Sequence, residues 1–93
     1  MDDANSLNSY AWWCFENRVN LKEAQKLAAR GIELAEPGSD KAMILDTAAE
    51  ICNALGNCGQ SVAYIKEAIA QDPDRASYHK QLERFQKLLE ESE

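Results

Sequence analysis

The chain contains three cysteines, Cys14, Cys52 and Cys58, and their thiols are the side chains best able to do covalent chemistry. A redox site normally places two thiols in a Cys-x-x-Cys motif, whereas Cys52 and Cys58 are separated by a predicted turn. An odd number of cysteines without paired spacing supports neither a disulfide framework nor a four-cysteine zinc site. We therefore expect reduced thiols, with Cys14 and Cys52 in the core and Cys58 more exposed at a helix start.

The other residues of catalytic type are isolated from one another. His79 is the only histidine, so a metal site built on a histidine pair is impossible. The closely spaced acidic side chains lie at the termini and around Pro73, where we expect solvated or capping roles and no catalytic pair. No glycine-rich phosphate loop follows a strand, because no strand is predicted. The sequence thus predicts a protein that is not an enzyme and binds neither metal nor cofactor, with a thiol-dependent activity of Cys58 as the weaker alternative.

Length and charge restrict the class of protein further. The 93 residues suffice for one modest core, so we expect residues 1–93 to form a single domain. Ten Lys and Arg against sixteen Asp and Glu give a net charge of −6, which argues against nucleic acid or an anionic membrane as a partner. No apolar run approaches the roughly 18 residues of a membrane span, and the acidic start is unlike a signal peptide. A cytoplasmic protein is the default expectation.

All of the expected secondary structure is helical. Ala, Leu, Glu, Lys and Gln dominate between the Gly and Pro positions, while Val and Thr are scarce. Asn20 and Asn57 are expected to cap helix N-termini through their side chains, Gly56 to end a helix in a left-handed turn, and Pro73 to stop the next helix. Short connections make neighbouring helices antiparallel. Five helices are expected, at about 5–17, 21–35, 40–55, 58–71 and 75–91.

The chain also repeats itself. Leu7, Ala11 and Cys14 recur as Leu45, Ala49 and Cys52, each displaced by 38 positions. The following helix recurs at a displacement of 37, which pairs Asn20 with Asn57, Ala24 with Ser61, Ala28 with Ile65 and Gly31 with Ala68. A period in the mid-thirties that contains two helices and a closing proline predicts a helical solenoid, with small residues where helices cross closely.

The second repeat resembles the tetratricopeptide repeat (TPR). The resemblance is clearest at positions 44–50 and 54–57, at Ala68-Ile69 and at Asp72-Pro73-Asp74. It extends over repeat one at about 5–38, repeat two at about 42–75 and a capping helix at about 76–91. It implies an all-α fold of antiparallel helical hairpins stacked as a short right-handed solenoid, which acts as a protein–protein interaction scaffold. Ser61 departs from the family pattern, because alanine is usual there.

In TPR proteins the first helix of each repeat lines a concave groove, and the resemblance implies a groove with an aromatic end, an acidic middle and a basic end. Such a groove suits an amphipathic helix or an extended peptide that carries apolar and charged groups. The chaperone-binding carboxylate clamp of some family members is not implied, because its first Lys and Asn are replaced. The expected partner-binding residues are Asn8, Trp12, Phe15, Glu16, Asp46, Glu50, Asn53, Lys80, Arg84 and Lys87.

Trp12 and Trp13 are successive on a helix, about 100° apart, so both cannot face the core. Either Trp13 packs inward while Trp12 covers the mouth of the groove, or Trp12 beside Phe15 anchors a partner. Two repeats fall below the three or so that usually stabilise a solenoid. A homo-oligomerisation module, with a homodimer as the simplest form, is therefore the alternative function, and a C-terminal interaction domain of a larger protein is another.

Overall fold

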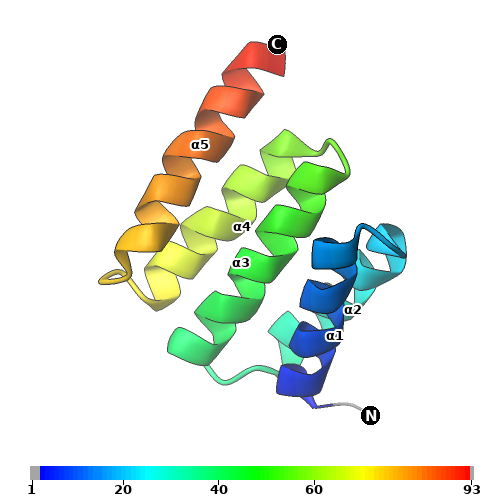
Figure 1. Cartoon of the computed structure of the whole chain (residues 1–93). Coiled ribbons are helices and arrows are strands. Elements are labelled where there is room, and N and C mark those ends of the chain that lie inside the picture. Colours follow the sequence, from blue (N-terminus) through cyan, green and yellow to red (C-terminus); the bar gives the residue numbers. More distant parts are fainter. Residues whose placement is uncertain (1–2, 93) are drawn as a thin grey trace.

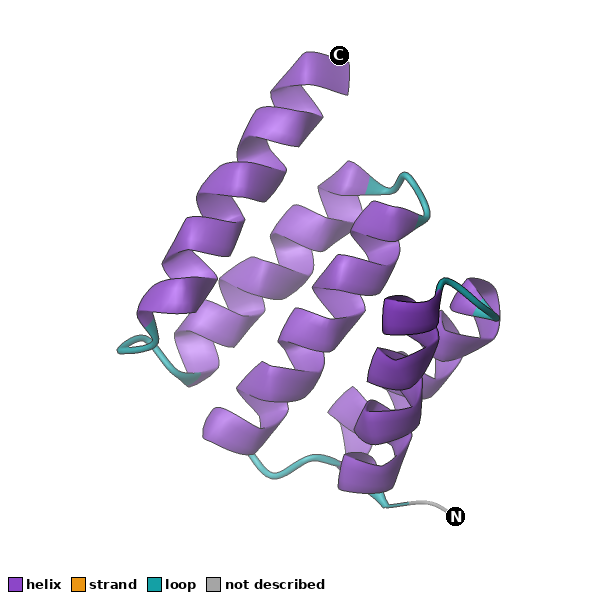
Figure 2. Ribbon diagram, viewed as in Figure 1, coloured by secondary structure: helices purple, strands orange, loops and turns teal. Residues whose placement is uncertain are grey.

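Five α-helices form the part of the chain that this computed structural model describes, residues 3–92, and no strand occurs in that range (Figures 1 and 2). Each expected helix boundary lies within one residue of the observed one, so the prediction of five helices and an all-α fold is confirmed. The helices are α1 (Ala4–Asn17), α2 (Leu21–Leu34), α3 (Ser39–Ala54), α4 (Cys58–Gln71) and α5 (Ala76–Ser92).

The helices form two antiparallel hairpins and a fifth helix. α1 pairs with α2 and α3 pairs with α4, while α2 also packs against α3 and α4 against α5. In Figure 1, α1, α3 and α5 run in one direction, and α2 and α4 return behind α1 and α3. The molecule is a thin slab with extents of 38 × 30 × 18 Å. This arrangement places α3 between α1 and α5.

Two clusters of buried side chains hold the helices together. The first cluster joins α1 and α2 to α3 and consists of Ala11, Cys14, Ala24, Ala28, Ala48 and Ile51. The second cluster joins α3, α4 and α5 and consists of Ala42, Leu45, Ala49, Val62, Ile65, Ala68, Tyr78 and Phe85.

Small residues let neighbouring helices approach closely. A Cβ atom built on Gly31 lies 3.3 Å from Cγ2 of Ile44, so any larger residue at this position presses on α3. The Ser61 hydroxyl is completely buried and donates a hydrogen bond to the carbonyl oxygen of Ala49 at 2.9 Å. The hydrogen bond offsets the cost of burying the hydroxyl.

The internal repeat is visible in the burial pattern. In the first helices of the hairpins, Leu7, Ala11 and Cys14 are buried, and so are their counterparts in α3. In the second helices, Ala24, Ala28 and Gly31 are buried, as are their counterparts in α4. Two sequence segments therefore place the same positions in the core.

The turn between α3 and α4 follows the expected chemistry. Gly56 adopts a left-handed conformation with φ of 86°, which glycine tolerates without strain. The Asn57 side chain then accepts a hydrogen bond from the backbone N–H of Gln60 at 3.3 Å, as an N-cap does. α4 ends at Gln71, two residues before Pro73. These three expectations are confirmed.

The expected side-chain cap at Asn20 is wrong. Asn20 is itself left-handed, with φ of 50°, and its side chain makes no capping hydrogen bond. A side-chain N-cap normally has extended backbone angles, which direct its oxygen toward the first-turn amides. The backbone carbonyl of Asn20 still accepts the first helical hydrogen bond, from the N–H of Ala24 at 2.8 Å, as N-cap carbonyls do.

Among residues 3–92, none of the helices combines the length and the apolar character that a membrane span requires.

Candidate functional site

Two of the three thiols are core side chains. Cys14 and Cys52 are completely buried. Burial raises the pKa of the Cys52 thiol, and a hydrogen bond from the Gln25 amide to its sulfur, at 3.3 Å, opposes the rise only in part. A thiol held neutral in this way is a poor nucleophile. Cys58 is half-buried at the first residue of α4.

The single histidine makes a local structural contact. His79 is exposed on α5, and its Nε2 atom lies 3.0 Å from the carbonyl oxygen of Pro73 in the preceding turn. Over residues 3–92, no three side chains of the metal-binding types His, Cys, Asp and Glu lie together so as to hold an ion.

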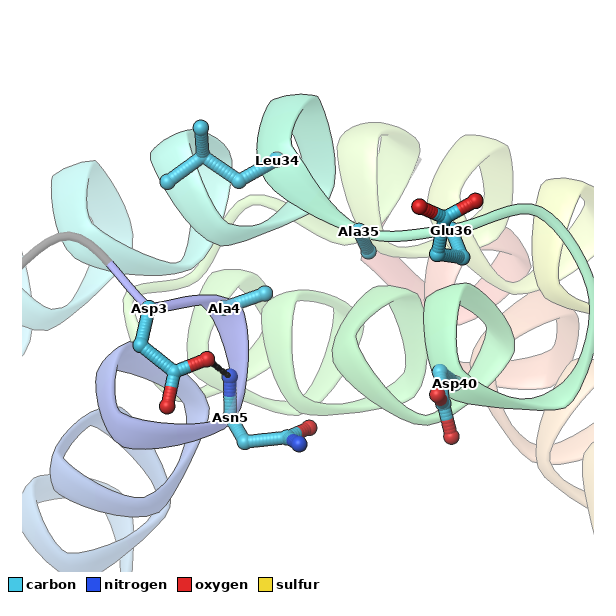
Figure 3. Close-up of a pocket in the computed structure, with 7 residues that line it drawn as sticks. All are labelled: Asp3, Ala4, Asn5, Leu34, Ala35, Glu36 and Asp40. Atoms are coloured by element: carbon cyan, nitrogen blue, oxygen red, sulfur yellow. Dashed lines mark hydrogen bonds between the residues drawn. The ribbon is translucent and has the colours of Figure 1, made fainter.

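An open pocket of about 260 Å³ lies where the start of α1 meets the end of α2 and the start of α3. Three carboxylates, from Asp3, Glu36 and Asp40, are among its lining groups. Figure 3 shows that they point in different directions, and that the Asp3 carboxylate is turned toward the backbone N–H of Asn5. Asp3 thereby caps α1, and the pocket has no converging set of polar groups.

The expected groove residues of α3 lie on the side of that helix that the other helices cover least. Half of the α3 residues are buried, whereas Asp46, Glu50 and Asn53 are half-buried and Met43 is exposed. These four residues recur every three or four positions, so they form one stripe along the helix. Figure 1 shows α3 between α1 and α5, so we call the surface that these three helices share the α1–α3–α5 face.

A hydrogen-bonded ion pair links α5 to this stripe. Nη2 of Arg84 lies 2.6 Å from Oε1 of Glu50, and only 14% of the Glu50 side chain is exposed. Half of the Arg84 side chain remains exposed, and its guanidinium lies 4.7 Å from the centroid of the Phe85 ring. The expected acidic middle and basic end of the groove therefore meet at this point.

Asp46 lies beside this pair in an unusual electrostatic environment. Burial and the nearby Glu50 carboxylate raise its pKa from 3.8 to about 6. A hydrogen bond with the Gln81 side chain and the positive charges of Arg84 and Arg75 act in the opposite direction. Among residues 3–92, three buried acceptor atoms on α1, α3 and α5 lack hydrogen-bond partners, namely Asn8 Oδ1, Asp46 Oδ1 and Gln81 Oε1. The polar part of the α1–α3–α5 face thus contains acceptor atoms that no donor among residues 3–92 reaches.

Aromatic side chains from α1 lie at the other end of the expected groove. The rings of Trp12 and Phe15 are half-buried, with centroids 5.1 Å apart, and Phe15 packs against the first core cluster. The Phe15 ring has a further contact with the Arg18 guanidinium, which lies over it at 4.8 Å from the ring centroid. The ring pair is therefore held in place by the fold.

The expectation that Trp13 packs inward is wrong. Trp13 is 52% exposed, while its neighbour Trp12 is half-buried. The buried positions of α1 are Leu7, Ala11 and Cys14, and Trp13 points away from them. Trp13 instead contacts Tyr10, with ring centroids 6.2 Å apart.

The structure thus brings together some of the expected residues and leaves others apart. Asp46, Glu50 and Arg84 meet, whereas Glu16, Lys80 and Lys87 are exposed side chains outside that cluster. Sequence reasoning missed Gln81, although it lies one turn before Arg84 and therefore on the same side of α5. Sequence reasoning also missed Met43, which lies one turn before Asp46 on the same side of α3.

No protein-family model matches this chain, and no curated protein or solved structure matches it.

Proposed function

We propose that this protein is a TPR-like interaction module whose α1–α3–α5 face binds a helix or an extended peptide of a partner protein. The shared burial of repeat-equivalent positions in the two hairpins supports the TPR-like part of the proposal. A right-handed stack of two repeats closed by α5 is the architecture that this pattern favours.

The observation that carries the binding role is the composition of the α1–α3–α5 face. The three helices of this layer carry an ion pair and a carboxyl group of raised pKa. They also carry three buried acceptors that have no hydrogen-bond partner among residues 3–92. An acceptor without a donor costs free energy, which a partner with N–H groups recovers once the side chains rotate toward it. The Trp12 and Phe15 rings at the α1 end of this face offer apolar area for an anchor.

Selection of peptides from a displayed random library on the immobilised full chain tests this proposal. Peptides that bind the α1–α3–α5 face should lose about tenfold or more in affinity for Trp12→Ala, because an aromatic anchor is removed. Glu50→Gln should weaken binding of those peptides that carry a basic side chain. Titration calorimetry on folded variants, checked by circular dichroism, gives the affinities.

Two matched variants serve as controls for that experiment. Trp13→Ala removes the same side chain from the other side of α1, and Glu67→Gln changes an exposed carboxylate on α4. Both should leave peptide affinity unchanged. A library that yields no binder, or binders that Trp12→Ala and Trp13→Ala weaken equally, would show that this face is not the binding site.

A further inference from the structure

The outer side of the first hairpin exposes a set of apolar side chains. Tyr10 and Trp13 of α1 are 41% and 52% exposed, and their rings are nearly parallel, with an interplanar angle of 16°. On α2, Leu34 is 44% exposed and Leu27 is half-buried, seven positions earlier on the same helical stripe. We call the surface made by Tyr10, Trp13, Leu27 and Leu34 the end face.

The second hairpin indicates how such positions are normally covered. At the displacement of 38, Tyr10 and Trp13 correspond to Ala48 and Ile51, which are buried in the cluster that joins α3 to α1 and α2. Two residues of α4 are the counterparts of Leu27 and Leu34 at the displacement of 37. These are Tyr64, which packs against the same cluster, and Gln71, which accepts a hydrogen bond from Gly38 N–H at 2.8 Å.

Three of the four counterparts therefore lie in or against the cluster that α3 shares with the first hairpin, and Gln71 contacts the loop that follows that hairpin. The end face repeats, in register, an interface that is formed inside this molecule, and nothing among residues 3–92 covers it. Its apolar side chains are those that a further pair of helices would bury.

The other end of the stack differs in character. None of the large apolar side chains with the highest exposure belongs to α5, whose outward residues include Lys80, Glu83 and Lys87. A second copy of the chain therefore has one apolar end to offer, which is its own end face. Contact between two identical surfaces is isologous and closes as a dimer.

The charges beside the end face are complementary under such a pairing. Glu23 and Arg30 are exposed and lie on the same stripe of α2 as Leu27, one on each side of it. When α2 packs antiparallel to α2 of a second copy, Glu23 lies opposite Arg30 of that copy. Antiparallel packing of α1 likewise sets Tyr10 against Trp13 of the second copy, since these residues lie on either side of the helix midpoint.

We propose that the end face joins two copies of this chain as an isologous dimer, in which α1 and α2 of each copy pack antiparallel to the same helices of the other. This inference does not depend on the proposed function, because the end face and the α1–α3–α5 face use different sides of α1. Trp12 belongs to the α1–α3–α5 face and Trp13 to the end face, so alanine variants of these two residues distinguish the two proposals.

Sedimentation equilibrium of the full chain, from low micromolar to millimolar concentration, tests the inference. The wild-type mass should rise from 10.4 kDa to twice that value. Trp13→Ala should raise the dissociation constant about tenfold or more, while Trp12→Ala should leave it unchanged. Glu23→Lys should weaken the dimer, and adding Arg30→Glu to that variant should restore it.

Leu34→Glu provides a second disruption if Trp13→Ala fails to fold by circular dichroism. A wild-type mass of 10.4 kDa at every concentration would overturn the inference and leave helices of another protein as the occupant of the end face. This mode of pairing would be overturned if Trp12→Ala and Trp13→Ala weakened the dimer equally. It would also be overturned if Arg30→Glu did not reverse the weakening caused by Glu23→Lys.

Discussion

Arg84 and Glu50 are 34 positions apart in the chain, yet Nη2 of the first lies 2.6 Å from Oε1 of the second. This contact links the polar side of α5 to α3, whereas the apolar side of α5 packs in the second core cluster. The orientation of α5 is thus determined on two sides. The pair also occupies the centre of the α1–α3–α5 face, so its removal tests the construction of that face.

Arg84→Ala should lower the free energy of unfolding by about 1 kcal/mol, because the mostly buried Glu50 carboxylate loses its partner. Urea denaturation measures the loss. Lys87→Ala, which removes an exposed cation one turn further on, should change stability much less. If the two variants are equally stable, the ion pair contributes nothing beyond a surface charge.

Asp46→Asn should make the protein more stable near neutral pH. In the unfolded chain Asp46 ionises near 3.8, but in the folded chain it ionises near 6, because burial and Glu50 disfavour its charge. Between these values the folded state holds more protons, so the contribution of Asp46 to stability falls as pH rises from about 4 to about 6 and is constant above. The two values correspond to at most about 3 kcal/mol.

Urea denaturation at pH 4 and pH 7 isolates this contribution as the difference between wild type and Asp46→Asn. The difference should be small at pH 4 and should favour the variant at pH 7. Asp74→Asn, at an exposed position, serves as the control for removal of a negative charge. A wild type that is more stable than Asp46→Asn at pH 7 would contradict the assignment.

Gly31→Val should destabilise the protein by about 1–3 kcal/mol, because the added side chain overpacks the contact with Ile44. Gly31→Ala should be close to neutral, since the gain in helix propensity of up to about 1 kcal/mol opposes the tight contact. Thermal denaturation of both variants measures the effect. Equal stability of the valine and alanine variants would mean that α2 and α3 are not in close contact there.

Thiol alkylation of the native protein should modify Cys58 first. Cys14 and Cys52 are completely buried, so their reaction requires local or global unfolding and should be about tenfold slower or more. Mass spectrometry of digested samples over time gives the rate at each site. In urea the three rates should converge, and rapid native labelling of Cys52 would contradict its placement in the core.

Most of the fold follows from residues with one strong conformational preference. Gly56, Asn57 and Pro73 act where expected, because a left-handed turn, a cap and a helix stop depend on local chemistry. The predicted side-chain cap at Asn20 is wrong because the end of α1 determines the conformation of this residue. There Arg18 is left-handed and its N–H bonds back to the carbonyl of Cys14, and the turn that follows leaves Asn20 left-handed as well.

The candidate site was predictable only in outline. The repeat register predicted that Asp46 and Glu50 lie on the groove side of α3. The register alone does not determine the rotation of α5 about its own axis. The observed rotation brings Gln81 and Arg84 to α3 and leaves Lys80 outside. For the tryptophans, helical spacing showed that one must leave the core, and the buried Ala11 and Cys14 determine that it is Trp13.

The two core clusters differ in the size of their side chains. The first contains four alanines, one cysteine and Ile51, whereas the second contains Tyr78 and Phe85 together with several branched residues. Because smaller side chains remove less apolar area from water, α1 and α2 should open more readily than α3 and α4. Amide hydrogen exchange should therefore be fastest in the first hairpin, and binding at the end face should slow it most there.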